Sequence, residues 1–192
     1  VTRLEQKINE KENFETFMAL PSEILKDKIK FLFTLLSDTD IKLDNFAIII
    51  SCISRGLKLN HNLELSDEII GPFISYINSG LRFSDYTKGN IVKILSFLGK
   101  DKFTKNIEIV RTYLKSRVNT KVISALTEIN PTIWQTLIPT LVEILQSNDD
   151  FIVKREIIYL FNKLDINQII IQLINDPNYK SNQGLDDILL KF

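Results

Sequence analysis

Apolar residues recur at intervals of three and four along most of the chain. The spacing first becomes clear at Ile24, Leu25, Ile29, Leu32, Leu35 and Leu36. An α-helix has 3.6 residues per turn, so this spacing gathers the apolar side chains on one helix face. Ser22 stands just before the stripe, and serine is a residue type that caps helix N-termini. A helix is therefore expected from about residue 22 to residue 37.

The next segment, residues 42–57, is apolar on most sides. It contains the uncharged run from Phe46 to Ile53, which is rich in β-branched residues. Such a run is compatible with a buried strand, but the segment is longer than most strands, and length favours a helix. A helix that is apolar on most sides is expected to lie between other helices.

Helix-period spacing then continues to the end of the chain, interrupted by capping and breaking residues. Ser84 and Gly99 mark the two ends of one helix, and Pro139 is expected to kink another. The further helices are expected at 66–80, 84–99, 103–115, 119–129, 131–147, 150–164 and 166–174, with short helices at 4–20 and 185–192.

Consecutive helices are joined by short connectors, which favours antiparallel neighbours. Four pairs follow, near residues 22–57, 66–99, 103–129 and 131–164, and their starts are 28 to 44 residues apart. An irregular repeat of two helices predicts an all-α fold, a right-handed α-solenoid of about four antiparallel pairs. Residues 1–192 are expected to form a single helical-repeat domain with extra helices at both ends. Because the chain begins at Val1 and stays apolar up to Phe192, we expect it to belong to a longer protein.

The last pair resembles a HEAT repeat. The family has a proline two residues before a leucine in its first helix, an aspartate opening the second helix, and then valine, arginine and a closing leucine. The matching positions are Pro139, Leu141, Asp149 or Asp150, Val153 and Leu164. Arg155 is displaced by one position because Lys154 intervenes, and Ile157 replaces the usual alanine. A weaker copy comprises Pro72, Phe73, Ser84, Asp85 and Leu98.

The resemblance implies a HEAT-like or armadillo-like superhelix that acts as a scaffold. It does not imply one activity, because this fold serves many functions. A helical superhelix of the VHS or ENTH kind is the alternative architecture. The tetratricopeptide pattern of Trp, Leu, Gly and Tyr is absent.

The rare residue types exclude several kinds of site. The chain has one cysteine, Cys52, and one histidine, His61, so it lacks the ligands of the usual zinc sites. No glycine-rich phosphate-binding motif occurs among its six glycines. Cys52 lies in an apolar run and is interpreted as a buried core residue. We therefore expect no cofactor, no metal and no catalytic site.

The charge balance argues against a strongly basic nucleic-acid arm. Lys and Arg number 24, as do Asp and Glu, and the net charge is zero. The longest uncharged apolar run is far shorter than the roughly 20 residues that cross a bilayer.

An intracellular protein, in the cytoplasm or nucleus, is expected. The abundance of Ile, Asn and Lys suggests a eukaryote with an AT-rich genome.

The second helices of the pairs line the inner face of a HEAT-like array. They carry ten basic and six acidic residues in this sequence, which predicts a mildly basic face that binds an acidic peptide or helix of a partner protein. The candidate contact residues are Lys88, Lys93, Lys121, Arg155, Tyr86 and Tyr159. Solvated helix faces and ordinary packing are the competing interpretation of these residues.

The alternative function is a nucleic-acid-binding module for DNA repair or chromosome association. Such a site needs many phosphate contacts and usually aromatic walls. The chain's one tryptophan, Trp134, falls on a first helix and is interpreted as a packing residue. A protein partner is therefore favoured over a nucleic acid.

Overall fold

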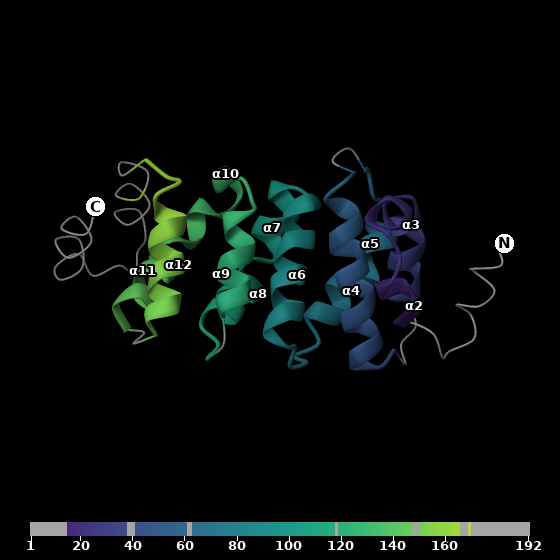
Figure 1. The fold of residues 1–192 in the computed structure, drawn as a ribbon, viewed down its shortest axis with the longest axis horizontal. Coiled ribbons are helices and arrows are strands. Elements are labelled where there is room, and N and C mark those ends of the chain that lie inside the picture. The colour runs from purple at the N-terminus through teal and green to yellow at the C-terminus, as the bar shows by residue number, and fades with distance from the viewer. Residues whose placement is uncertain are drawn as a thin grey trace. The chain divides into compact units, whose positions relative to one another are not determined.

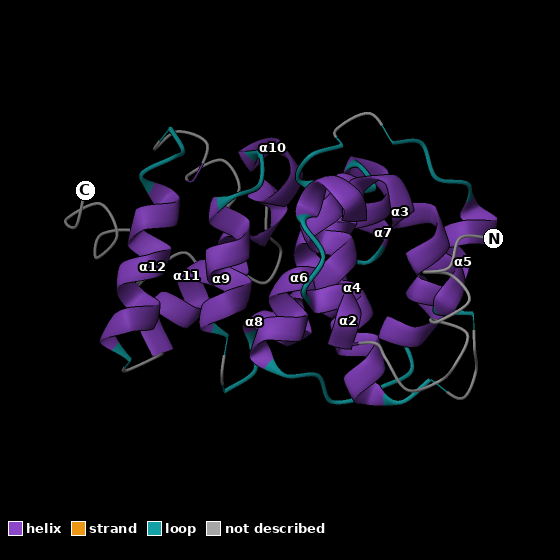
Figure 2. Cartoon of the chain, turned by 45° about the vertical axis from the view of Figure 1, so that its right-hand side comes forward, coloured by secondary structure: helices purple, strands orange, loops and turns teal. Residues whose placement is uncertain are grey.

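The computed structural model describes residues 15–37, 41–60, 63–117, 119–147, 150–165 and 169. These residues form helices, turns and loops, and none of them lies in a strand (Figure 1, Figure 2). The all-α class predicted from the sequence is confirmed. The chain divides into two compact units, Val1–Leu98 and Gly99–Phe192.

The first unit contains five described helices: α2 (Glu15–Met18), α3 (Ser22–Leu35), α4 (Leu43–Leu57), α5 (Asp67–Ile77) and α6 (Asp85–Phe97). Helix α3 packs against α4 and α5, and α4 packs against α2 and α6 (Figure 1). The expectation that residues 42–57 form a helix between other helices is confirmed.

Three aromatic residues form a cluster in this unit. The rings of Phe46 and Tyr76 stack with centroids 4.1 Å apart, and Phe83 lies 5.3 Å from Phe46. Tyr76 Oη donates a hydrogen bond to Ile41 O over 3.2 Å, so its polar end is satisfied while its ring packs. This cluster joins α4 and α5 to the segment that leads into α6.

Arg55 ties α2 to α4. Its guanidinium donates hydrogen bonds to Met18 O over 2.9 Å and to Leu20 O over 2.7 Å. Met18 is the last residue of α2 and Leu20 follows it, and carbonyls at a helix C-terminus lack partners within the helix. Together with the buried Phe17, the two bonds hold α2 against α4.

Helices in this unit are capped at their N-termini in two ways, by a side chain or by the backbone alone. Ser84 caps α6 as expected, with Oγ accepting from Thr87 N over 3.2 Å. Ser22, predicted as a cap, is instead the first residue of α3, and Pro21 occupies the cap position. Pro21 O accepts from the N–H groups of Ile24 and Leu25, both over 3.1 Å. The extended backbone of proline directs this carbonyl into the first turn without a side-chain cap.

The second unit contains α7 (Lys100–Lys105), α8 (Ile107–Leu114), α9 (Thr120–Thr127), α10 (Pro131–Trp134), the 3₁₀ turn η1 (Gln135–Leu137), α11 (Ile138–Ser147) and α12 (Phe151–Phe161). Helix α8 packs against α9 and α11, α12 packs against α9 and α11, and α10 packs against α7. Figure 1 shows α9 and α12 side by side.

The prediction of one helix over residues 103–115 was wrong. Gly99, with φ of 97°, starts α7 three residues earlier, and the helix ends at Asn106. The side-chain Nδ2 of Asn106 donates a hydrogen bond to Lys102 O over 2.9 Å. Asparagine competes in this way with the backbone for helical carbonyls, so the segment breaks into α7 and α8.

The predicted helix over residues 131–147 is also broken, but ahead of Pro139 and not at it. The turn η1 separates α10 from α11, which places Pro139 second in α11. The missing N–H of proline costs nothing in a first turn. Asn130 starts α10 as its side chain accepts from Thr132 N over 3.1 Å.

Trp134 is fully buried in the second unit, as its interpretation as a packing residue requires. Its indole Nε1 donates to Ile129 O over 3.3 Å. Several predicted positions lie outside the described residues: the helix at 185–192, the helix at 166–174 apart from residue 169, most of the segment 4–20, Asp149 and His61.

Candidate protein-binding surface

The first unit carries Tyr86, Lys88 and Lys93, all on α6. The Tyr86 side chain is 56% exposed, and both lysines are partly buried. Tyr86 and Lys93 are seven residues apart and therefore lie on one stripe of the helix. Lys88 comes two residues after Tyr86, so it projects from the opposite side. The structure thus brings Tyr86 and Lys93 together on one face and separates Lys88 from them.

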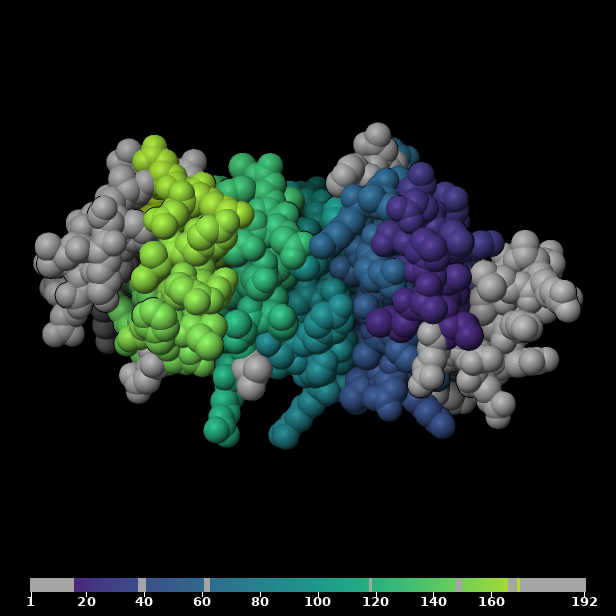
Figure 3. All heavy atoms as spheres, in the orientation of Figure 1, coloured from purple at the N-terminus to yellow at the C-terminus, as the bar shows by residue number. Residues whose placement is uncertain are grey.

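The second unit carries Lys121 on α9 and Arg155 and Tyr159 on α12. The two helices pack against each other, and their atoms adjoin on the face shown in Figure 3. Lys121 and Arg155 are exposed, and Tyr159 is 56% exposed. These three predicted residues therefore belong to neighbouring helices of one unit.

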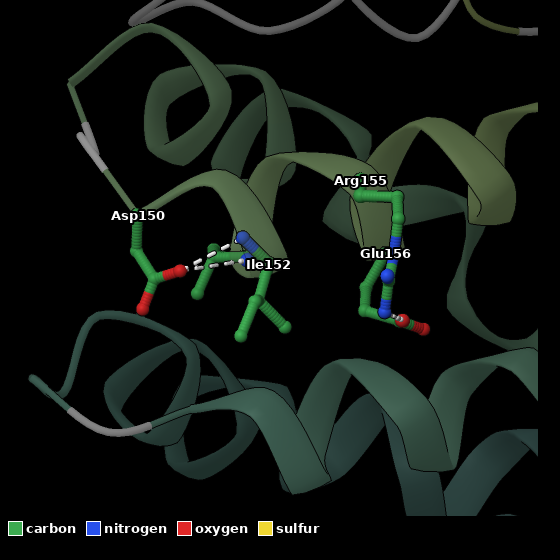
Figure 4. A network of polar contacts seen from close by, with 5 residues as sticks. Asp150, Ile152, Arg155 and Glu156 are labelled. Carbon is green, nitrogen blue, oxygen red and sulfur yellow. Dashed lines mark hydrogen bonds and ion pairs between the residues drawn. The ribbon is translucent and has the colours of Figure 1, made fainter.

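Arg155 pairs with its neighbour Glu156, with 2.9 Å between Nη2 and Oε1 (Figure 4). Asp150 caps α12, and its Oδ1 accepts from Ile152 N over 2.8 Å and from Val153 N over 3.5 Å (Figure 4). Reversal of Arg155 would therefore leave the cap of α12 in place.

Tyr159 has a cation beside it from its own helix end. Lys163 Nζ lies 5.4 Å from the centroid of the Tyr159 ring, within the range of a cation–π interaction. The same Nζ donates a hydrogen bond to Thr127 O, at the end of α9. Lys163 thus links the C-terminal ends of α9 and α12 and holds Tyr159 on the exposed surface beside them.

The basic surplus of the second helices is smaller than the sequence count suggests. Arg55 already donates hydrogen bonds to the carbonyls of Met18 and Leu20. Arg155 pairs with Glu156, and Lys163 donates a hydrogen bond to Thr127 O. Lys58, Lys88, Lys93 and Lys121 also have interactions within the chain. Because intrachain partners compete with an external anion, these side chains would capture an anion less strongly than a count of charges implies.

The structure adds an apolar feature that the sequence reading had not singled out. Phe151 and Ile152, at the start of α12, are 74% and 50% exposed. Ile152 and Tyr159 are seven residues apart and lie on one stripe, away from the buried Val153 and Ile157. The seven-residue spacing of Ile152 and Tyr159 is visible in the sequence. It was missed because the core residues of α12 are more numerous and dominate the apolar pattern.

Other chemistry is limited in the part of the chain that the structure describes. No group of three or more His, Cys, Asp and Glu residues there could hold a metal ion. Cys52 is buried, as expected, and burial raises the pKa of its thiol to about 11, although the Arg55 guanidinium partly opposes this. A thiol that stays protonated at neutral pH is a poor nucleophile.

An open polar hollow lies at the ends of α8 and α11. The ion pair between Lys115 Nζ and Glu143 Oε2, at 2.8 Å, lies at its wall.

Among the described helices none is long and apolar enough to span a bilayer. Comparison of the chain with models of known families, with curated proteins and with solved structures finds no match.

Proposed function

We propose that this chain is a non-catalytic protein-interaction scaffold built from HEAT-like helix pairs, arranged as a right-handed α-solenoid. The observation that carries the proposal is the order of packing within each unit. First helices pack on first helices, α3 on α5 and α8 on α11, and second helices on second helices, α4 on α6 and α9 on α12. Stacked pairs in this order share a continuous core, which is the principle of a helical repeat protein.

The proposed partner is an acidic peptide or helix that binds along the second helices. Tyr86 shares a stripe of α6 with Lys93, about two turns away, and Tyr159 lies about one turn from Arg155 on α12, so each exposed ring has a cation on its own helix. Tyrosine and arginine are enriched among residues that dominate binding energy, because each offers a large contact area with a polar end. A location in the cytoplasm or nucleus remains part of this proposal.

Binding of a labelled 20-residue peptide of Glu and Leu, measured by fluorescence anisotropy at two salt concentrations, tests the proposal. A peptide with Lys in place of Glu is the control ligand. The double variant Lys93→Glu/Lys121→Glu should keep the helical circular dichroism signal and lose most of the binding and of its salt dependence. Full binding by the double variant would exclude a basic second-helix face. Arg155 is left out because reversing it also breaks its pair with Glu156.

The nucleic-acid alternative has weaker support. Trp134 is buried with its indole N–H bonded to Ile129 O, so it offers no surface on which a base could stack. A short DNA duplex in the same anisotropy assay separates the two functions, since tight, steeply salt-dependent binding would favour the nucleic acid.

A further inference from the structure

Helix α2 lies on α4, which is the second helix of the first pair (Figure 2). Its four residues, Glu15–Met18, are too few to form a stable helix without tertiary contacts. Among the described side chains of α2, only that of Phe17 is buried. The Arg55 guanidinium adds two hydrogen bonds, to the carbonyls of Met18 and Leu20. The docking of α2 therefore depends on one aromatic ring and two hydrogen bonds.

The Arg55 side of α4, which binds α2, does not face α3. A Cβ atom at Gly56 would meet the backbone of α3, so the Gly56 side of α4 faces that helix. Arg55 is one residue earlier and points about 100° away from this side. Helix α4 also packs on α6, whose exposed Tyr86 and nearby Lys93 belong to the proposed partner site. A partner that continues along the second helices from α6 onto α4 therefore reaches the helix on which α2 lies.

Helix α2 has the chemistry of the proposed partner. Its sequence, Glu-Thr-Phe-Met, combines an acidic residue with an aromatic one and contains no basic residue. It therefore presents to α4 a short acidic helix with an apolar anchor, the class of ligand proposed for the second helices.

The α2 seat, the part of α4 on which α2 lies, is incompletely satisfied. Ser51 is one helical turn before Arg55 on the same stripe of α4. It is buried, and its hydroxyl has no hydrogen-bond partner among the described residues. An unpaired buried hydroxyl is unfavourable, so a helix that offered it a partner would bind this stripe better than α2 does.

We propose that α2 is an autoinhibitory segment, which closes the α4 part of the partner site until an acidic helix displaces it. This inference rests on the proposed function and adds a regulatory step to it. When α2 leaves, the Arg55 guanidinium loses both carbonyls and becomes available to a carboxylate of the partner. The partner also gains the apolar contacts that the Phe17 ring makes, but it must first undock α2, and this lowers its apparent affinity.

Phe17→Ala should release α2 without changing any charge or any residue of the second helices. Its affinity for the 20-residue peptide of Glu and Leu should rise about tenfold, the factor expected if α2 is undocked about a tenth of the time in the wild type. Met18→Ala removes an exposed side chain of the same helix, so it is the matched control and should bind like the wild type. Fluorescence anisotropy measures all three affinities. Equal affinities of Phe17→Ala and the wild type would overturn the proposal.

Adding α2 back as a separate peptide tests the α2 seat directly. A peptide of residues 13–20, capped at both ends, should bind Phe17→Ala about tenfold more tightly than the wild type, whose seat is occupied. It should also displace the peptide of Glu and Leu from the variant. The same capped peptide with Ala at position 17 should do neither. If the capped peptide bound both proteins equally, or neither of them up to millimolar concentration, an exchangeable α2 seat would be excluded.

The inference and the proposed function can fail separately. If the wild type and Phe17→Ala bind the peptide of Glu and Leu equally, the scaffold function stands and autoinhibition fails. If neither binds it, the proposed function fails, and the capped peptide of residues 13–20 alone decides whether α4 accepts an external helix.

The helical dichroism signal and the urea midpoint of Phe17→Ala check that the first unit stays folded. If they show unfolding, Arg55→Lys takes its place in both assays. Lysine keeps the positive charge but lacks the fork that bonds both carbonyls, so this variant should also release α2 and bind the peptide of Glu and Leu more tightly. A peptide affinity equal to that of the wild type would then overturn the proposal.

Discussion

At Gly56, the backbone of α4 lies close against the backbone of α3. Replacing this glycine therefore tests the packing of the first unit directly. A Cβ atom added at Gly56 would lie 3.0 Å from both the carbonyl carbon and oxygen of Leu25 and 3.1 Å from Cγ1 of Ile29. Ordinary contacts of a Cβ atom begin at 3.4 Å. The Leu25 atoms belong to the helix backbone, so no side-chain rotation relieves the overlap, and the two helices must separate by several tenths of an ångström.

Two opposing terms set the size of the effect of Gly56→Ala. Alanine favours the helical backbone over glycine by about 1 kcal/mol. Overpacking of a close-packed core costs about 1–3 kcal/mol, and Leu25 and Ile29 are fully buried. The variant should therefore unfold with a free energy about 0–2 kcal/mol below that of the wild type.

Gly71→Ala is the matched control, because nothing lies within 4 Å of a Cβ atom at Gly71 in α5. The same propensity gain applies there without overlap, reduced because residue 71 precedes Pro72. We expect about 0–1 kcal/mol of stabilisation. Urea unfolding followed by circular dichroism measures both variants. If Gly56→Ala proved as stable as Gly71→Ala, the close approach of α3 and α4 would be wrong.

Four further predictions concern the core, a brace, a cap and a thiol. Leu141→Ala and Leu160→Ala each remove a fully buried side chain and should cost about 2–5 kcal/mol in urea unfolding; unchanged midpoints would contradict the packing of α11 and α12. Arg55→Ala should expose α2 to limited proteolysis, because two carbonyls lose their donor; an unchanged cleavage pattern would argue against the brace. Asp150→Ala should cost about 1 kcal/mol in thermal or urea unfolding through loss of the α12 cap. The pKa of the Cys52 thiol rises from 9.0 to about 11 on folding, so its protonated form stabilises the protein below pH 9 and this contribution is lost as the pH rises toward 11, by roughly 2 kcal/mol. Cys52→Ala should lack this part of the alkaline loss, which urea unfolding at pH 8 and pH 11 would reveal.

Much of the helix order could be predicted from the sequence, because apolar periodicity records which face of a segment is buried. The ends of α6 and α12 were predicted within a few residues, since serine, glycine and aspartate act locally at these helix ends. The breaks at Asn106 and before Pro139 were not predicted. An asparagine inside an apolar period gives no sign of whether its amide will bond a helical carbonyl. Pro139 was expected to kink the middle of a helix, but it stands in the first turn of α11, where proline is tolerated.

The candidate surface was predictable only as a list of residue types. Spacing placed Tyr86 and Lys93 on one stripe, but it did not reveal that Arg155 pairs with Glu156 or that Arg55 bonds two carbonyls 35 and 37 residues away. Such partners come from tertiary packing and have no local signal. The exposure of Ile152 likewise follows from which side of α12 meets α9 and α11, which a single helix period does not determine.

Because Trp134 is buried in the second unit, its fluorescence reports on the unfolding of that unit. The chain has one tryptophan, so emission excited near 295 nm arises from residues 99–192, whereas the helical dichroism arises from both units. When the core around Trp134 opens, water reaches the indole and the emission shifts to longer wavelength, regardless of the state of α3 to α6. Coincident fluorescence and dichroism transitions in urea would mean that the two units unfold as one cooperative block. Separated transitions would give each unit its own unfolding free energy from a single titration, without cutting the chain.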